Sequence, residues 1–126
     1  MAHKRVFIAF AIEDEITKYL FTGQAKNKKV PFDFIDMSIK EPYDEKWKTK
    51  CRARIRSCDG FIALISKHTE NSDGELWEID CAKEEKIPIF GIYINDSSWI
   101  NKPINMFWID CKQWTWDNIK EFIESL

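Results

Sequence analysis

Glu78 is the side chain best placed for chemistry in this sequence of 126 residues. It belongs to a predicted helix that Ser72 or Asp73 can cap, because either side chain can accept a hydrogen bond from a backbone N–H two or three residues further on. The loop before that helix leaves the strongest apolar run, 61–65, which predicts a buried central strand. Open α/β sheets bind ligands at the carboxyl ends of their strands, so we expect Glu78 at the mouth of a crevice.

A fixed carboxylate at such a place suits the cleavage of a glycosidic bond. That reaction leaves oxocarbenium-like charge on the sugar, which a carboxylate can stabilise without a metal ion. Glu75, Glu78, Ile79 and Ala82 share one stripe of the predicted helix, so we expect Glu78 to lie beside a half-buried face and to be partly solvated. A Glu78→Gln exchange is then expected to change the free energy of unfolding by no more than about 0.5 kcal/mol.

The elements that must position Glu78 alternate along the chain. Apolar runs predict strands at 6–10, 32–37, 61–65, 88–94 and 106–110. Helical spacing predicts helices between and after them, with apolar positions at Ile12, Ile16, Tyr19 and Leu20 in the first, Trp47, Cys51, Ile55 and Cys58 in the second, and Ile119, Phe122, Ile123 and Leu126 in the last. Pro31 ends the first helix, Asp44 and Glu45 begin the second, and Thr115 caps the last.

This alternation predicts an α/β fold. We expect one domain, 1–126, built on a flavodoxin-like, doubly wound, five-stranded parallel sheet in the order 2-1-3-4-5, with helices on both faces. The run at 61–65 is uninterrupted and belongs at the centre, whereas the run at 32–37 alternates and belongs nearer an edge.

The composition is that of a folded protein without a strong overall charge. Hydrophobic residues make up 44% and charged residues 32%, and the net charge of −2 favours neither nucleic acid nor an anionic membrane. The four cysteines show no zinc spacing with the two histidines, so we expect reduced thiols and no metal site. No run approaches the roughly 18 apolar residues of a membrane span and no cleavable apolar segment precedes the first strand, so we expect a cytoplasmic protein.

Missing motifs exclude several enzyme classes that share this architecture. Neither G-x-G-x-x-G nor G-x-x-x-x-G-K-[ST] occurs, which argues against dinucleotide-binding dehydrogenases and P-loop NTPases. A receiver domain resembles this architecture but places a phosphate-accepting aspartate where Ser66 stands. No G-x-S-x-G or H-E-x-x-H motif offers a hydrolase site, so the function must be argued from other residues.

Three segments, 5–10 (RVFIAF), 34–38 (FIDMS) and 58–66 (CDGFIALIS), are followed by S-x-x-T at 66–69 and W-E-I-x-x-A at 77–82. In this order and spacing they resemble, over nearly all the chain, the TIR-like domain group, in particular the small bacterial TIR-like proteins of the Thoeris anti-phage system. Glu78 falls where catalytic members of that group carry their glutamate. Ala9 and Ala11 depart from the small hydroxylated residues of many relatives.

The resemblance implies cleavage of NAD by an NAD⁺ nucleosidase or ADP-ribosyl cyclase type of enzyme. In the Thoeris branch it implies a cyclic ADP-ribose-type signal that activates a partner effector protein in antiviral defence. It further implies self-association and no cofactor, since NAD is the substrate. The low net charge and the lack of an apolar span lead us to expect neither a membrane nor a nucleic-acid partner. Because the pyridinium is already a good leaving group, one glutamate can suffice, whereas a cyclic product demands an enclosed pocket that excludes water.

Glu78 is the catalytic residue that this resemblance implies. The residues expected to bind substrate are Phe10, Ala11, Asp36, Ser38, Trp47, Ser66, Thr69 and Trp77. Hydroxyls and carboxylates at strand ends suit ribose or phosphate, and the aromatic rings suit nicotinamide or adenine.

Other interpretations of the same residues stay open. Each residue also has a purely structural interpretation. Glu78 can be a solvated carboxylate on the helix surface, Trp47 and Trp77 can pack in the core, and Ser66 and Thr69 can form hydrogen bonds with backbone groups of their loop. The domain is then a non-catalytic interaction module, or a binder of small nucleotides or nucleic acid. Absence of NAD turnover at high protein concentration favours the module, and binding that collapses in salt favours nucleic acid.

Overall fold

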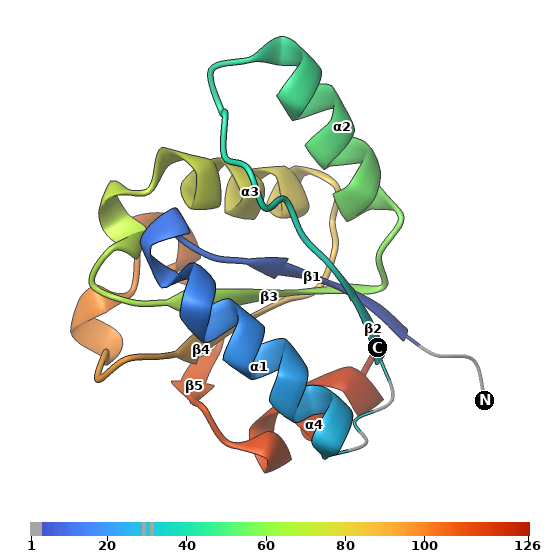
Figure 1. The fold of residues 1–126 in the computed structure, drawn as a ribbon, viewed down its shortest axis with the longest axis vertical. Helices are drawn as coiled ribbons and strands as arrows, with labels where there is room; N and C mark the ends of the chain where they lie inside the picture. The colour runs from blue at the N-terminus through green and yellow to red at the C-terminus, as the bar shows by residue number, and fades with distance from the viewer. Residues whose placement is uncertain (1–3, 29, 31) are drawn as a thin grey trace.

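The computed structural model describes residues 4–28, 30 and 32–126. Its parallel sheet has the order β2-β1-β3-β4-β5, which confirms the predicted topology. The strands are β1 (Lys4–Ala9), β2 (Phe32–Ile35), β3 (Gly60–Ile65), β4 (Ile89–Tyr93) and β5 (Cys111–Gln113). The loops that follow β1 and β3 lie at the same edge of the sheet, at the left of Figure 1, where parallel strands present their carboxyl ends.

Strand β3 is the centre of the sheet, and all six of its residues are buried. Phe61, Ala63 and Ile65 pack into the core on one face, and Ile62 and Leu64 pack into the core on the other. A strand covered on both faces needs apolar residues at every position rather than at alternate ones. This is why an uninterrupted apolar run predicted the central strand correctly.

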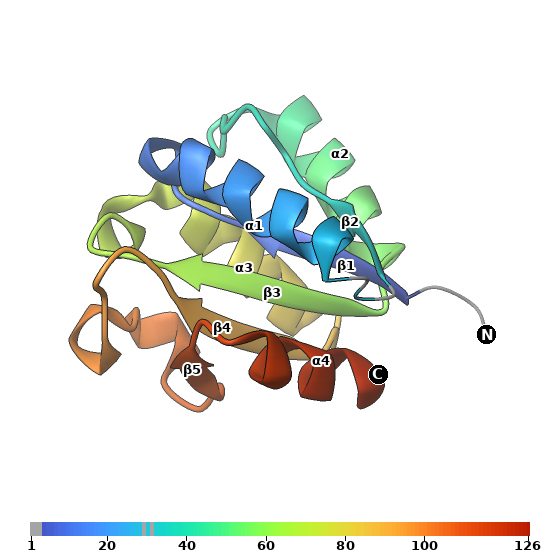
Figure 2. The same ribbon diagram turned by 60° about the horizontal axis from the view of Figure 1, so that its bottom comes forward.

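Four helices cover the two faces of the sheet: α1 (Glu15–Asn27), α2 (Glu45–Arg56), α3 (Asp73–Glu84) and α4 (Trp116–Glu124). Buried residues of α2 and α3 belong to one core cluster, and those of α1 and α4 belong to the other (Figures 1 and 2). Short 3₁₀ turns complete the connections at Ile12–Asp14, Thr69–Asn71, Trp99–Asn101 and Ile104–Met106.

The buried face of α1 differs from the predicted one. The expected apolar stripe of Ile12, Ile16, Tyr19 and Leu20 is exposed to solvent. The helix instead buries Lys18, Phe21, Thr22 and Ala25. Aromatic packing explains this rotation, because the Phe21 ring lies 5.6 Å from that of Trp114 and 5.3 Å from that of Trp116, which precede and begin α4. The predicted end of the helix at Pro31 lies outside the described residues.

The prediction of a last strand at 106–110 is wrong. Met106 is buried in a 3₁₀ turn, but Phe107 and Trp108 are 65% and 92% exposed. Pairing with β4 begins only where the Gly91 N–H donates to the Asp110 carbonyl oxygen, and β5 follows at Cys111–Gln113. The apolar run misled the prediction because the side chains of Phe107 and Trp108 stay largely exposed, whereas a strand of this sheet would bury them.

The caps predicted at Ser72 and Thr115 are confirmed, and Asp44, predicted only as an acidic residue at the start of its helix, is a cap as well. Asp44, Ser72 and Thr115 each accept a hydrogen bond from a backbone N–H in the first turn of α2, α3 and α4. The cysteines are free thiols, and three of the four are buried. Within the part of the chain that the structure describes, no helix has the length and apolar character needed to cross a bilayer.

Candidate active site

Glu78 lies on the face of α3 that packs against the sheet and α2, and it has no exposed surface. Ser72 begins the helix by accepting from the Glu75 N–H, so position 78 falls in the second turn. The predicted stripe of Glu75, Glu78, Ile79 and Ala82 is wholly buried. The expectation that Glu78 is partly solvated is therefore wrong, because the loop between β2 and α2 closes over it.

Lys40, in that loop, closes the site. Its ammonium nitrogen lies 3.0 Å from Glu78 Oε1 and 2.9 Å from Oε2, so it donates to both carboxylate oxygens. The same nitrogen lies 4.0 Å from the centre of the Phe10 ring. Its aliphatic stem passes over Gly74, where an added Cβ would come within 2.8 Å of Lys40 Cβ. Glycine at position 74 therefore lets the lysine reach across the start of α3.

Burial sets the electrostatics of Glu78. Loss of hydration raises the pKa of its carboxyl to about 7, and the Lys40 ammonium opposes that rise. The Cys51 thiol lies 3.9 Å from Oε2, and the nearby Asp36 carboxylate raises the pKa slightly. The carboxyl thus titrates near neutrality and depends on an adjacent cation to stay ionised.

Glu75, one turn earlier on α3, is a second buried carboxyl. Among the described residues, neither of its oxygens has a hydrogen-bond partner. The Thr69 hydroxyl is close enough to lower its pKa in part, but donates its hydrogen to the Leu64 carbonyl oxygen at 3.4 Å. Burial and the Glu78 charge raise the pKa of Glu75 well above its ordinary value, which favours the neutral form of this side chain.

Asp14 is the third acidic group near the ends of the strands, and it is 3% exposed. Its carboxylate accepts a short hydrogen bond from the Ser66 hydroxyl and a longer one, 3.4 Å, from Asn95 Nδ2. A hollow of about 470 Å³ opens beside this cluster, lined by residues that follow β1, β3 and β4: Glu13, Asp14, Ser66, Lys67, His68, Asn95, Asp96, Ser97 and Asn101. Its carboxylates and hydroxyls suit the hydroxyl groups of a sugar better than a phosphate.

The structure brings some predicted substrate-binding residues together and separates others. Phe10 and Ala11 follow β1 in the chain and are both buried. The Lys40 ammonium, which pairs with Glu78, lies over the Phe10 ring and so connects Phe10 to Glu78. Ser66 lines the polar hollow. Thr69 is fully buried and accepts from the Ser66 N–H at 2.9 Å, which is the loop-stabilising alternative.

Asp36 and Ser38, also predicted to bind substrate, lie in different environments. The Asp36 carboxylate lies 3.0 Å from the Lys18 ammonium, and Ser38 is exposed on the loop. Lys18 is itself buried, so Asp36 neutralises it rather than standing free for a ligand.

Trp47 and Trp77 pack on each other, with ring centres 5.4 Å apart. Trp47 Nε1 donates to the Ile39 carbonyl oxygen at 2.6 Å, and the Trp77 ring lies 5.6 Å from the Arg52 guanidinium. The two rings therefore support the α2–α3 contact and hold the loop beside Lys40, which favours packing over stacking on a substrate base.

Sequence reasoning missed Lys40, Asp14 and Asn95. Lys40 stands in a polar loop without local periodicity, and nothing in its neighbours indicates a partner on α3. The sequence did contain a signal for the turn at Asn95, because Asn and Asp are residue types that tolerate positive φ angles. In the structure Asn95 and Asp96 adopt φ angles of 50° and 60°.

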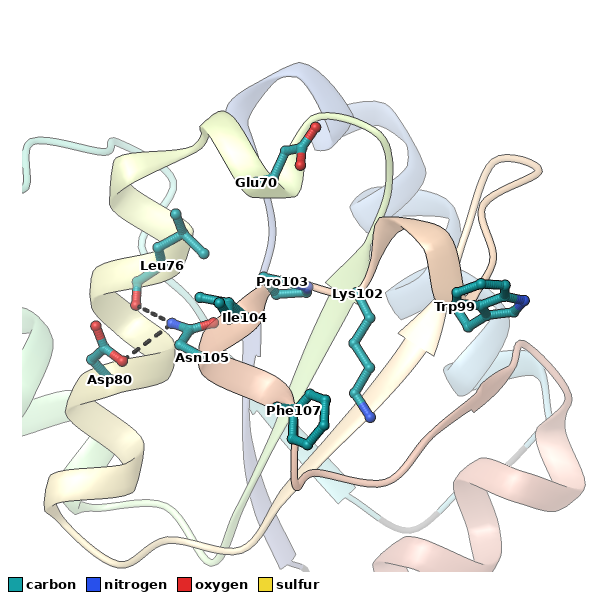
Figure 3. Close-up of a pocket in the computed structure, with 9 residues that line it drawn as sticks. All are labelled: Glu70, Leu76, Asp80, Trp99, Lys102, Pro103, Ile104, Asn105 and Phe107. Carbon is teal, nitrogen blue, oxygen red and sulfur yellow. Dashed lines mark hydrogen bonds between the residues drawn. The ribbon is translucent and has the colours of Figure 1, made fainter.

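A second hollow, of about 670 Å³, lies between α3 and the 3₁₀ turns after β4 (Figure 3). Asn105 Nδ2 anchors its floor by donating to the Leu76 carbonyl oxygen at 3.1 Å and to Asp80 Oδ1 at 3.2 Å. Leu76 and Asp80 are one turn apart, and Glu78 projects from the opposite side of the same helix. This hollow is therefore separate from the Glu78 site.

Comparisons with known proteins agree with this architecture. No curated protein matches the sequence. The solved IL-17 receptor B SEFIR domain is similar with a TM-score of 0.65 and 10% identity, over 99% of this chain and 98% of that one. The CMP N-glycosidase BcmB of Clostridium botulinum has a TM-score of 0.54 and 21% identity over 97% of both chains. A prokaryotic SEFIR domain has a TM-score of 0.54 and 12% identity, over 97% of this chain and 88% of that one.

At these identities the solved structures establish the fold alone. The family is established by sequence: the model described as Thoeris protein ThsB, TIR-like domain, matches residues 7–99. That segment includes the end of β1, all of β2, β3 and β4, the Lys40 loop and all of α3. The chain therefore belongs to the TIR-like domain family of Thoeris protein ThsB.

Proposed function

We propose that this protein cleaves the nicotinamide–ribose bond of NAD and that Glu78 is its catalytic carboxylate. The observation that carries the proposal is a fully buried carboxylate that holds a cation against an aromatic ring at the carboxyl edge of the sheet. Membership of the ThsB family supports it, and so does the printed name of one structural neighbour, a CMP N-glycosidase.

The reaction breaks the bond between ribose C1′ and the pyridinium nitrogen. The bonding electron pair goes to that nitrogen, which leaves as neutral nicotinamide, and the ribose becomes an oxocarbenium-like cation. A carboxylate in a desolvated site stabilises this charge strongly. Water then attacks C1′ and loses a proton to give ADP-ribose, or a nucleophilic atom of the same molecule attacks to give a cyclic product.

We propose the cyclic product, as a signal to a partner effector in anti-phage defence within the cytoplasm. The enclosure of Glu78 favours it, because capture by an internal nucleophile requires that water be excluded. We also propose that the free chain is weakly active until it is triggered or assembles with other copies, since an uncontrolled NAD consumer would harm its own cell.

Chromatography of NAD incubated with the purified protein at high concentration, where copies of the chain can assemble, tests this function. We expect nicotinamide and one cyclic nucleotide in equal amounts, and neither with Glu78→Gln. Glu84→Gln is the matched control, since that side chain lies on the same helix and is 62% exposed. Linear ADP-ribose alone would overturn the cyclase assignment, and full turnover by the Glu78→Gln protein would overturn the catalytic one.

A non-catalytic interaction module is the second candidate. Exposed large apolar side chains favour it, namely Ile16, Leu20, Trp99, Ile100, Ile104, Phe107 and Trp108. Sedimentation over a concentration series tests whether these surfaces associate, with Trp108→Lys as the variant and Lys46→Met, at an exposed lysine of α2, as the control. Concentration-dependent association without NAD turnover, abolished by Trp108→Lys, would make the module the better assignment.

A further inference from the structure

Helix α1 turns an apolar stripe toward solvent. Ile16, Tyr19 and Leu20 are 78%, 58% and 55% exposed, and together with Gly23 they follow the spacing of one helical face. We propose that this stripe is a dimer interface, on which α1 of a second copy of the chain packs in antiparallel orientation around a two-fold axis beside Leu20. The inference goes beyond the proposed function, because it does not depend on cleavage of NAD.

The fold gives this stripe no partner within the described part of the chain. Helix α1 buries Lys18, Phe21, Thr22 and Ala25, so its contacts with the sheet and with α4 lie on the other side of the helix. In Figure 1, α1 crosses the front of the molecule, and no other segment is drawn over it. A surface helix ordinarily presents polar side chains to water, so an apolar outer stripe indicates contact with another molecule.

Gly23 supports this interpretation, because nothing in the described structure requires a glycine at that position. Its φ angle is not positive, and a Cβ added to it would meet no atom of another segment within 4 Å. Glycine inside a helix lowers the stability of that helix relative to alanine. The residue is explained if it lets a second helix approach closely, as glycine does where two backbones meet.

The charges of α1 favour a second copy as the partner. Glu15 lies in the first turn of the helix and Lys26 in the last. Neither side chain has an ion-pair partner among the residues that the structure describes. Antiparallel packing places the acidic start of one helix beside the basic end of the other, twice in each dimer. The surface is therefore complementary to itself.

The shape of the stripe fits the same arrangement. Ile16 lies four residues before Leu20 and Gly23 lies three residues after it, so their distances from an axis beside Leu20 differ by only about 1.5 Å. Ile16 of each copy then faces Gly23 of the other, a large side chain opposite an open space. Parallel packing would instead place Ile16 against Ile16 and Glu15 against Glu15.

The length of α1 suits a weak, reversible dimer. The helix has 13 residues and is about 20 Å long. One pair of such helices buries less than the roughly 800 Å² per partner that is typical of a stable interface. We therefore expect the dimer to form at high protein concentration and to dissociate on dilution.

Sedimentation of the purified protein over a concentration series up to about 1 mM tests the interface. We expect a monomer–dimer equilibrium that Leu20→Glu weakens at least about tenfold. Ile104→Glu is the matched control, because that side chain is 92% exposed in the 3₁₀ turn between β4 and β5, and it is expected to leave the equilibrium unchanged. A parent protein that stays monomeric, or a dimer that Leu20→Glu leaves intact, would overturn the inference.

Gly23→Gln separates the interface from folding. The new side chain enters open space and has a higher helix propensity, so the midpoint of thermal unfolding is expected to stay the same or to rise. The dimer is nevertheless expected to weaken at least about tenfold, because the bulk of glutamine stands where Ile16 of the other copy packs. Unchanged or tighter association of Gly23→Gln would overturn the inference.

Exchange of charges tests the antiparallel orientation. Glu15→Lys and Lys26→Glu are each expected to weaken self-association several-fold, whereas an equal mixture of the two variants is expected to recover a dimer as tight as that of the parent protein. A mixture that associates no better than either variant alone would overturn the antiparallel arrangement. These measurements contain no NAD, so their outcome is independent of whether the protein cleaves NAD.

Discussion

Glu75 and Glu78 lie one turn apart on α3, and neither has any exposed surface, yet Lys40 pairs with Glu78 alone. One helix therefore buries an ionisable group that depends on a cation and another whose neutral form is favoured by burial. Two neighbouring carboxyls with such different environments are a common arrangement in sites that handle charge.

Glu78→Gln is expected to reduce NAD cleavage by roughly 100-fold to 1,000-fold, since it removes the charge that faces the developing oxocarbenium ion. It is also expected to lower the free energy of unfolding by at least about 1 kcal/mol, because Lys40 loses its buried counter-charge. Kinetics and denaturant unfolding of the same samples measure both effects. This stability loss replaces the near-zero change expected from sequence, and an unchanged midpoint would contradict it.

Glu75→Met is expected to raise the free energy of unfolding by about 1–3 kcal/mol at neutral pH. The native carboxyl is buried without a hydrogen-bond partner among the described residues, and an apolar side chain of similar length removes that cost. Glu70→Met on the exposed surface is the control. Destabilisation by Glu75→Met would show that this carboxyl has a favourable partner. Glu75 is for the same reason unsuitable as a control for the catalytic role of Glu78.

Stability is expected to fall as pH rises from mildly acidic to neutral values. Burial raises the folded-state pKa of Glu78 to about 7 from its ordinary value of 4.5, and raises that of Glu75 as well, so the folded protein binds more protons than the unfolded chain in this range. The stabilisation is fully present below the unfolded pKa and is lost as pH rises through the folded one. Urea unfolding at a series of pH values measures it.

Two comparisons check the origin of that pH dependence. The Glu75→Met/Glu78→Gln variant is expected to show a flatter profile, and a profile as steep as that of the parent would assign the effect to other groups. Glu85 acts in a separate, more acidic range, because Arg56 and Arg52 lower its pKa to about 2, so its contribution to stability is lost only as pH falls toward that value.

NAD turnover is expected to change with pH in the opposite direction to stability. Catalysis needs ionised Glu78, so the rate is expected to rise as pH increases through neutrality.

Ser66→Ala is expected to lower the free energy of unfolding by about 1–3 kcal/mol, because the Ser66 hydroxyl is the closest donor to the buried Asp14 carboxylate. Ser57→Ala removes an exposed hydroxyl and is expected to leave stability nearly unchanged. Thermal unfolding of both variants makes the comparison. A large rise in KM for NAD with unaltered stability would instead restore Ser66 to the role of a substrate ligand.

Local sequence patterns determined the strand order, the central place of β3 and the caps of α2, α3 and α4. These features depend on residues close together in the chain: a run of apolar residues covered on both faces, or an acceptor side chain two or three positions before its N–H. The same pattern placed Glu78 on one stripe with Glu75, Ile79 and Ala82, and that stripe is the buried one.

Tertiary structure alone decided how deeply that stripe is buried and which residues contact it. Lys40 and Glu78 are 38 positions apart, and no local period links them. Periodicity states which residues of a helix share a face, but the partners brought by the fold select the face that is covered, which is why α1 buries Phe21 and exposes Ile16. The pKa of Glu78 follows from the same cause, because desolvation and a distant ammonium act only once the chain has folded.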